Sequence, residues 1–122
     1  MKLRFRSNSL RLRVNRREVE SLSSGSVLRE QVQFPGDAQL AYLLEKSAVS
    51  SPQVDFAQGT IRVTIPSDCI ENWARGDEIG MYFELPANGS SLKVAIEKDL
   101  ACVDGPVEEL DPDAYPRSGK NC

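Results

Sequence analysis

The sequence predicts a mainly β (α+β) fold with two short helices, built as a tandem ββαββ repeat. Over much of the chain apolar and polar residues alternate with a period of two, which is typical of strands with one buried face. In addition, residues 2–36 align with residues 53–87 at a constant offset of 51, and after one added residue 42–46 align with 94–98. Nearly every apolar position in one copy is apolar in the other, so the repeat determines the architecture.

The first element of each repeat is a predicted hairpin. Leu3 and Phe5 alternate with basic residues, and after Ser7-Asn8-Ser9 the alternation changes parity, so that the inward residues become Leu10, Leu12 and Val14. A change of parity across a short polar segment is typical of a tight turn between antiparallel strands. In the second copy Gln58-Gly59 occupies the turn, where glycine suits a positive φ.

A short helix follows the hairpin. Asn15 is its predicted N-cap, because Glu18 stands three residues later as in a capping box. Its apolar stripe and glycine end are Val19, Leu22 and Gly25. The second copy has the same features at Pro66-Ser67, Ile70, Trp73 and Gly76. Because Trp73 falls where the first copy has Leu22, we expect it in the core rather than on a binding surface.

A second hairpin completes each unit. In the first copy Leu28–Phe34 turns at Pro35-Gly36-Asp37 into Leu40–Leu44. In the second copy Ile79–Leu85 turns around Asn88-Gly89 into Leu92–Ile96. Proline, glycine, asparagine and aspartate are the residues that such turns favour. Each unit is therefore predicted to consist of a hairpin, a short helix and a second hairpin.

The repeats predict one domain over residues 1–103, with copies at 2–47 and 53–99 and a linker at 48–52. Each copy is close to the lower limit for independent folding, so we expect both to share one core. Residues 104–122 have three prolines, five acidic residues and no hydrophobic period. We predict that they form an extended or disordered acidic tail.

The composition argues against an enzyme. The chain has no histidine, which excludes Ser-His-Asp and Cys-His catalysis, and its three cysteines, Cys69, Cys102 and Cys122, are too far apart in sequence for a zinc motif. We therefore predict free thiols and no catalytic residue, metal site or cofactor. No apolar run is long enough for a membrane helix, and the start of the chain lacks the apolar centre of a signal peptide. The expected location is the cytoplasm.

Three short motifs, in order, carry a family resemblance. They are Ser7-Asn8-Ser9 before a strand that ends at Val14, Ile65-Pro66 at a helix entry, and Gly76-Asp77-Glu78-Ile79 before the second hairpin. This order resembles AbrB-type transition-state regulators and MazE-type antitoxins, in which two chains interleave their hairpins into one swapped-hairpin barrel. The chain departs from the family at Ser7, where glycine is usual, and at Asn15, where proline is usual.

The resemblance implies that one chain carries both halves of the family dimer, as a pseudo-twofold swapped-hairpin-like β-barrel, and a monomer is expected. Two units packed side by side would bury the same alternating residues, so the sequence does not separate these arrangements. The chain also resembles an uncharacterised bacterial family that starts with this basic hairpin and ends its last strand in Glu97-Lys98-Asp99. Alternation places Glu97 and Asp99 on the outside of that strand. This position favours a structural role at the end of the strand over a catalytic one.

The net charge of −3 is distributed unevenly along the chain. Residues 1–51 carry +4, residues 52–103 carry −4 and residues 104–122 carry −3. The candidate nucleic-acid site is the basic first hairpin and helix start, comprising Lys2, Arg4, Arg6, Arg11, Arg13, Arg16 and Arg17. The resemblance implies DNA contacts there, and arginine suits phosphates and guanine edges.

Two alternatives stay open for this basic segment, namely a solvated strand face whose charge prevents edge pairing, or a surface paired with the acidic second half. In the second copy only Arg11 keeps its positive charge, as Arg62, so a binding face would be one-sided.

The acidic tail is the second candidate site. Its charged and apolar residues are Val107, Glu108, Glu109, Leu110, Asp111 and Tyr115. The resemblance implies a segment that wraps a toxin-like protein partner and folds on binding. A solubilising tail, or one that folds back onto the arginines, would have the same composition. The leading hypothesis is thus a small non-catalytic DNA-binding-regulator- or antitoxin-like protein, and the alternative is a protein-interaction module that acts through the tail without nucleic acid.

Overall fold

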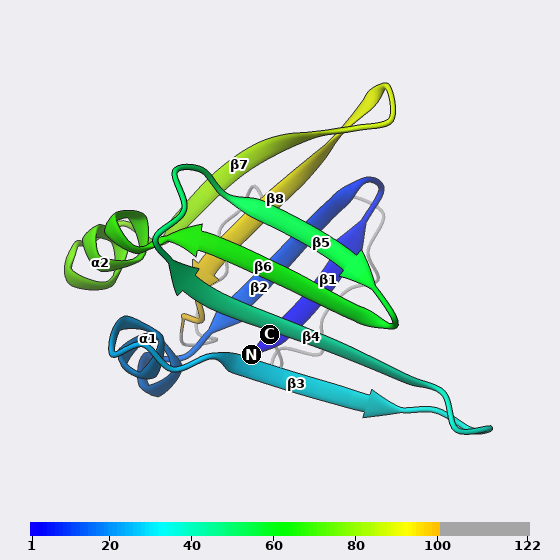
Figure 1. Ribbon diagram of the computed structural model, residues 1–122. Coiled ribbons are helices and arrows are strands. Elements are labelled where there is room, and N and C mark those ends of the chain that lie inside the picture. The colour runs from blue at the N-terminus through cyan, green and yellow to red at the C-terminus, as the bar shows by residue number, and fades with distance from the viewer. Residues whose placement is uncertain (101–122) are drawn as a thin grey trace, which may run out of the picture.

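The structure, a computed structural model, describes residues 1–100 (Figure 1). The elements follow one another in the order β1 (Lys2–Arg6), β2 (Ser9–Val14), α1 (Arg16–Ser23), β3 (Leu28–Gln33), β4 (Gln39–Ser47), β5 (Gln53–Ala57), β6 (Thr60–Pro66), α2 (Ser67–Arg75), β7 (Gly80–Ala87) and β8 (Ser90–Lys98). The mainly β class, the two short helices and the order of elements are those expected from the sequence.

The eight strands form two four-stranded sheets. Sheet A has the order β1-β2-β8-β7 and sheet B the order β3-β4-β6-β5. Each sheet consists of two antiparallel hairpins joined by one central parallel pair, β2 with β8 in sheet A and β4 with β6 in sheet B. Residues 1–47 therefore contribute one hairpin to each sheet, and residues 53–98 contribute the other.

The strand pairings within residues 1–100 do not close the two sheets into a barrel, contrary to the expected barrel. Packed sheets lie about 10 Å apart, whereas paired strands lie about 4.8 Å apart. The two sheets therefore remain separate layers on either side of the apolar core, and within residues 1–100 no strand of one pairs with a strand of the other. Among the described residues, the edge strands β1, β7, β3 and β5 each pair with one strand.

The core lies between the two sheets and beneath the two helices, which stand next to each other at one end of the sheets (Figure 1). Its fully buried side chains come from both halves of the chain and include Leu12, Leu22, Leu44, Ile65, Ile70 and Ile96. Trp73 is also buried, as expected, and its Nε1 donates a hydrogen bond of 3.0 Å to the carbonyl of Ile79.

Local signals in the sequence account for the ends of the elements. Asn15 caps α1, and the reciprocal hydrogen bonds of a capping box with Glu18 are both present. Gln58 and Gly59 have φ values of 52° and 72°, which a tight hairpin turn requires at both central positions. A Cβ at position 59 would also lie 2.9 Å from the carbonyl oxygen of Gln39, so the turn needs glycine.

Candidate nucleic-acid interface

The outer face of sheet A gathers most of the predicted basic residues. Side chains alternate between the faces of a strand, and the register sets Lys2 opposite Arg13 and Arg4 opposite Arg11. Because β2 pairs with β8, Lys93 joins them from the second half of the chain. The six cations on the strands of this face are Lys2, Arg4, Arg6, Arg11, Arg13 and Lys93.

Glu97 lies on the same face and is buried beneath its neighbours. Its Oε1 is 3.3 Å from Nε of Arg11 and 3.4 Å from Nε of Arg13, and its Oε2 accepts a hydrogen bond of 2.8 Å from the hydroxyl of Tyr82. The carboxylate thus links β8 to its two neighbours, β2 and β7, and partly neutralises both arginines. Alternation along the strand predicts Glu97 on its outer face, where it lies, but does not predict its burial, because the residues that cover it come from other strands.

Part of the basic segment therefore pairs with the acidic second half of the chain, as one of the two alternatives predicted. Lys2 Nζ lies 2.8 Å from Oδ2 of Asp99. Together with Arg11 and Arg13, Lys2 belongs to the cations that contact carboxylates of the second half. These residues have less charge to offer an external anion than their number suggests.

Arg4 and Arg6 differ from those paired cations. Both side chains are exposed on the edge strand β1, and no ion pair within residues 1–100 involves either one. Alternate residues of a strand are about 7 Å apart, so the two guanidinium groups stem from neighbouring positions along one line. Arg16 and Arg17 are also exposed, but they lie in the first turn of α1 and not on the strands of the face.

A network at the start of the chain holds β1 in place. The Met1 ammonium contacts the carboxylate of Glu18 and lies 3.1 Å from Oε2 of Glu30. Burial would lower the pKa of this ammonium, but the hydrogen bonds to Glu18 and Glu30 outweigh burial, so its pKa lies above the ordinary value of 8.0. The Tyr42 hydroxyl donates a 3.2 Å hydrogen bond to the Met1 carbonyl, and burial beside the same carboxylates raises the Tyr42 pKa. The strand that carries Arg4 and Arg6 is thereby tied to α1, β3 and β4.

The outer face of sheet B has a different charge distribution. Its outward strand positions hold two cations, Arg29 and Arg62, and two carboxylates, Glu45 and Asp55. Glu45 Oε1 accepts hydrogen bonds of 3.2 Å from both Arg62 and Thr64. The outer face of sheet A carries six cations against the strand carboxylates Glu84 and Glu97 and Asp99 just after β8, so positive charge accumulates on one sheet only.

The other candidate residues have structural contacts or lie elsewhere. Lys98 Nζ donates a 2.9 Å hydrogen bond to the Gly76 carbonyl and lies 5.7 Å from the centre of the Trp73 ring. Within residues 1–100, no three His, Cys, Asp or Glu side chains gather as a metal site, and Cys69 is a half-buried free thiol. The tail candidates Val107, Glu108, Glu109, Leu110, Asp111 and Tyr115, together with Cys102 and Cys122, lie outside the described residues. No helix in the described part is both long and apolar enough to cross a membrane.

Comparison with known proteins identifies the family of the chain. A family model described as "Family of unknown function (DUF7009)" matches residues 1–119, and the chain belongs to this family. This agrees with the expected membership of an uncharacterised family. Neither the curated proteins nor the solved structures contained a match. The comparisons show no AbrB- or MazE-type resemblance, so that part of the interpretation stays a prediction.

Proposed function

We propose that this member of a family of unknown function is a non-catalytic protein that binds double-stranded DNA through the outer face of sheet A. The observation that carries the proposal is the difference between the two sheets. Sheet A presents six cations on its outer face against three carboxylates, Glu84, Glu97 and Asp99, whereas sheet B presents two of each. Binding to the phosphate backbone needs such a concentration of positive charge on one surface.

Arg4 and Arg6 are the residues best suited to contact phosphates. They are exposed, carry no ion pair within the described part of the chain, and follow one another along β1. A planar guanidinium presents several N–H donors that match phosphate oxygens. Arg11 and Arg13 sit behind them across β2, where Glu97 restricts their side chains. We assign them a positioning role and a share of the long-range attraction.

The pairing pattern supports a pseudo-twofold design as part of this proposal. Exchanging β1 with β5, β2 with β6, β3 with β7 and β4 with β8 converts the strand order of one sheet into that of the other. We infer an open, two-sheet form of the fused swapped-hairpin architecture. In a regulator of this kind both halves would carry a basic hairpin. In this chain only the first does, so one monomer has one DNA face.

The test is DNA binding by matched charge variants across a salt series. One variant carries Arg4→Ser and Arg6→Ser, and the control carries Arg29→Ser and Arg62→Ser on sheet B. Both lose two positive charges, so their net charges are identical. Fluorescence anisotropy with a labelled mixed-sequence duplex gives the slope of log affinity against log salt concentration.

We expect the sheet A variant to bind more weakly and its salt slope to decrease by about 1.8, because two phosphate contacts are lost. The sheet B control should keep the slope of the unmodified chain. Absence of binding by the unmodified chain at low salt would contradict the proposal. Equal weakening of both variants would also contradict it, since net charge rather than a defined face would then control the affinity.

A further inference from the structure

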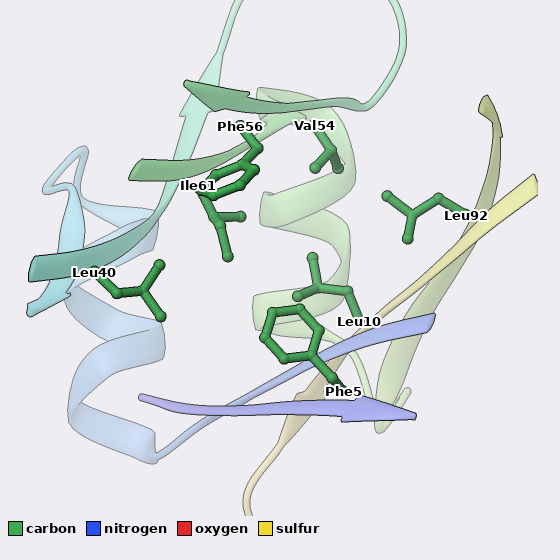
Figure 2. A pocket seen from close by; sticks show the side chains of 7 residues that line it. All are labelled: Phe5, Leu10, Leu40, Val54, Phe56, Ile61 and Leu92. Atoms are coloured by element: carbon green, nitrogen blue, oxygen red, sulfur yellow. The ribbon is translucent and has the colours of Figure 1, made fainter. Parts of the chain in front are cut away.

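An apolar cavity lies between the two sheets at the end away from the helices. Its volume is about 340 Å³, and Figure 2 shows the side chains of both sheets pointing into it. Seven apolar residues line it: Phe5, Leu10, Leu40, Val54, Phe56, Ile61 and Leu92. They flank the β1–β2 and β5–β6 turns or lie on β4 and β8, and no polar atom contributes to the lining.

The cavity has a closed floor and an aromatic mouth. Leu10 and Ile61 are buried at its base, whereas Phe5 and Phe56 are 59% and 68% exposed. In Figure 2 Phe5 and Leu10 from sheet A face Phe56 and Ile61 from sheet B. Two phenyl rings this exposed at the mouth of an apolar cavity leave a surface that gains free energy when it is covered.

The size of this surface decides what can cover it. A stable interface between two proteins buries about 800 Å² on each partner. A phenylalanine side chain offers about 150–250 Å², so the exposed parts of two such rings supply only about 250 Å². A second copy of the chain docked on the mouth alone would bury too little area. A ligand that enters the cavity gains contact with all of its walls.

The chemistry and volume of the cavity define the ligand further. With no polar atom in the lining, a charged or hydrogen-bonding group would lose its water contacts without a replacement. Apolar cavities of about 150 Å³ hold one benzene molecule, and small-molecule sites begin at about 300 Å³. We propose that this cavity binds a neutral apolar small molecule of about two to three aromatic rings, or a hydrocarbon of equal size. The proposal is independent of DNA binding.

The probe for the test is N-phenyl-1-naphthylamine, a neutral fluorophore of this size whose emission rises in apolar surroundings. The full chain is titrated and compared with two valine variants. Val54→Trp places an indole in the cavity, whereas Val27→Trp makes the same change at an exposed position just before β3 that does not line it. We expect saturable binding of one probe per chain, a loss of at least tenfold in Val54→Trp, and unchanged binding in Val27→Trp.

A second measurement keeps the proposal testable if Val54→Trp does not fold. In methyl NMR spectra of the full chain, probe addition should shift the methyl signals of Leu10, Leu40 and Ile61 but not those of Val27. Non-saturable binding, or unshifted cavity methyls, would overturn the proposal. It would also be overturned by contacts of the Phe5 and Phe56 rings with residues 101–122 in the probe-free protein. Sedimentation as a dimer that Val54→Trp dissociates would identify a second copy as the occupant instead.

Discussion

Sheets A and B are alike on their inner faces and different on their outer faces. Each consists of two antiparallel hairpins joined by a parallel pair, and each contributes fully buried aliphatic side chains such as Leu12 and Leu44. The outer face of sheet A carries six cations, whereas that of sheet B carries equal numbers of cations and carboxylates. The residues that build the fold are thus matched between the sheets, while the residues that meet solvent are not.

The inward residues of both sheets are required for folding, whereas the outward residues are open to selection for a function. Loss of an inward residue in either sheet leaves a cavity in the shared core. An outward cation has no such role, and a concentration of them on one sheet costs mutual repulsion. Lys2, Arg11 and Arg13 contact Asp99 or Glu97 and so contribute to the fold. Arg4 and Arg6 are exposed and make no ion pair within residues 1–100, so we place the proposed DNA contact at these two residues.

The largest effect should come from the shared core, and it should be equal in the two sheets. Leu44 on β4 and Ile96 on β8 are fully buried at corresponding positions. We expect Leu44→Ala and Ile96→Ala each to lower the free energy of unfolding by about 3 kcal/mol, through lost burial and a residual cavity. Urea unfolding followed by circular dichroism measures both values. If one variant lost little stability, the two sheets would not share one core.

An intermediate and unequal effect is expected at two carboxylates, Glu97 in sheet A and Glu45 in sheet B. The Glu97 side chain is 9% exposed and contacts two arginines and a tyrosine, whereas that of Glu45 is 22% exposed and contacts the half-exposed Arg62. Glu97→Gln should cost about 1–2 kcal/mol of unfolding free energy, and Glu45→Gln about 0.5 kcal/mol.

The same pair of variants also bears on DNA binding. Glu97→Gln removes a negative charge from the proposed face, next to Arg11 and Arg13, so it should strengthen DNA binding, whereas Glu45→Gln should not. Unfolding measurements and the anisotropy titration give the two readouts. Equal stability losses would show that burial does not distinguish these sites.

The smallest effect is a dependence of stability on pH, and it comes from a group of the first half of the chain. The Met1 ammonium has a raised pKa in the folded chain, so its stabilising contribution is complete below about pH 8 and is lost as pH rises through the folded pKa. Glu30→Gln should reduce this loss of stability by less than about 1 kcal/mol, since Glu30 is partly exposed. Chemical unfolding at intervals from pH 7 to pH 9.5 measures it, and identical pH profiles for both proteins would contradict it.

The local structure could be predicted well from the sequence. The change of parity across Ser7-Asn8-Ser9 locates the first turn, the Asn15–Glu18 spacing identifies the capping box, and Trp73 takes its expected place in the core. Each of these signals acts between residues that are close in the chain. Propensity, capping and alternation are therefore sufficient to place strands, helices and their inward residues.

The sequence does not predict which hairpin of one half pairs with which hairpin of the other half. Exchanged and side-by-side arrangements bury the same alternating residues, so only the β2–β8 and β4–β6 pairings decide between them. Those pairings also bring Lys93 into the basic face and cover Glu97 with Arg13. The cavity was missed for the same reason, because its walls come from six different strands.

The exchange of hairpins has a consequence for the linker at residues 48–52. Neither half of the chain can complete a sheet alone, because each hairpin finds its partner in the other half. The linker then acts mainly by giving the halves a high effective concentration, in the millimolar range for a short connection. A cut within it would turn folding into a bimolecular association of two fragments. Two intact chains could likewise trade halves, which makes domain swapping a natural route to a larger assembly.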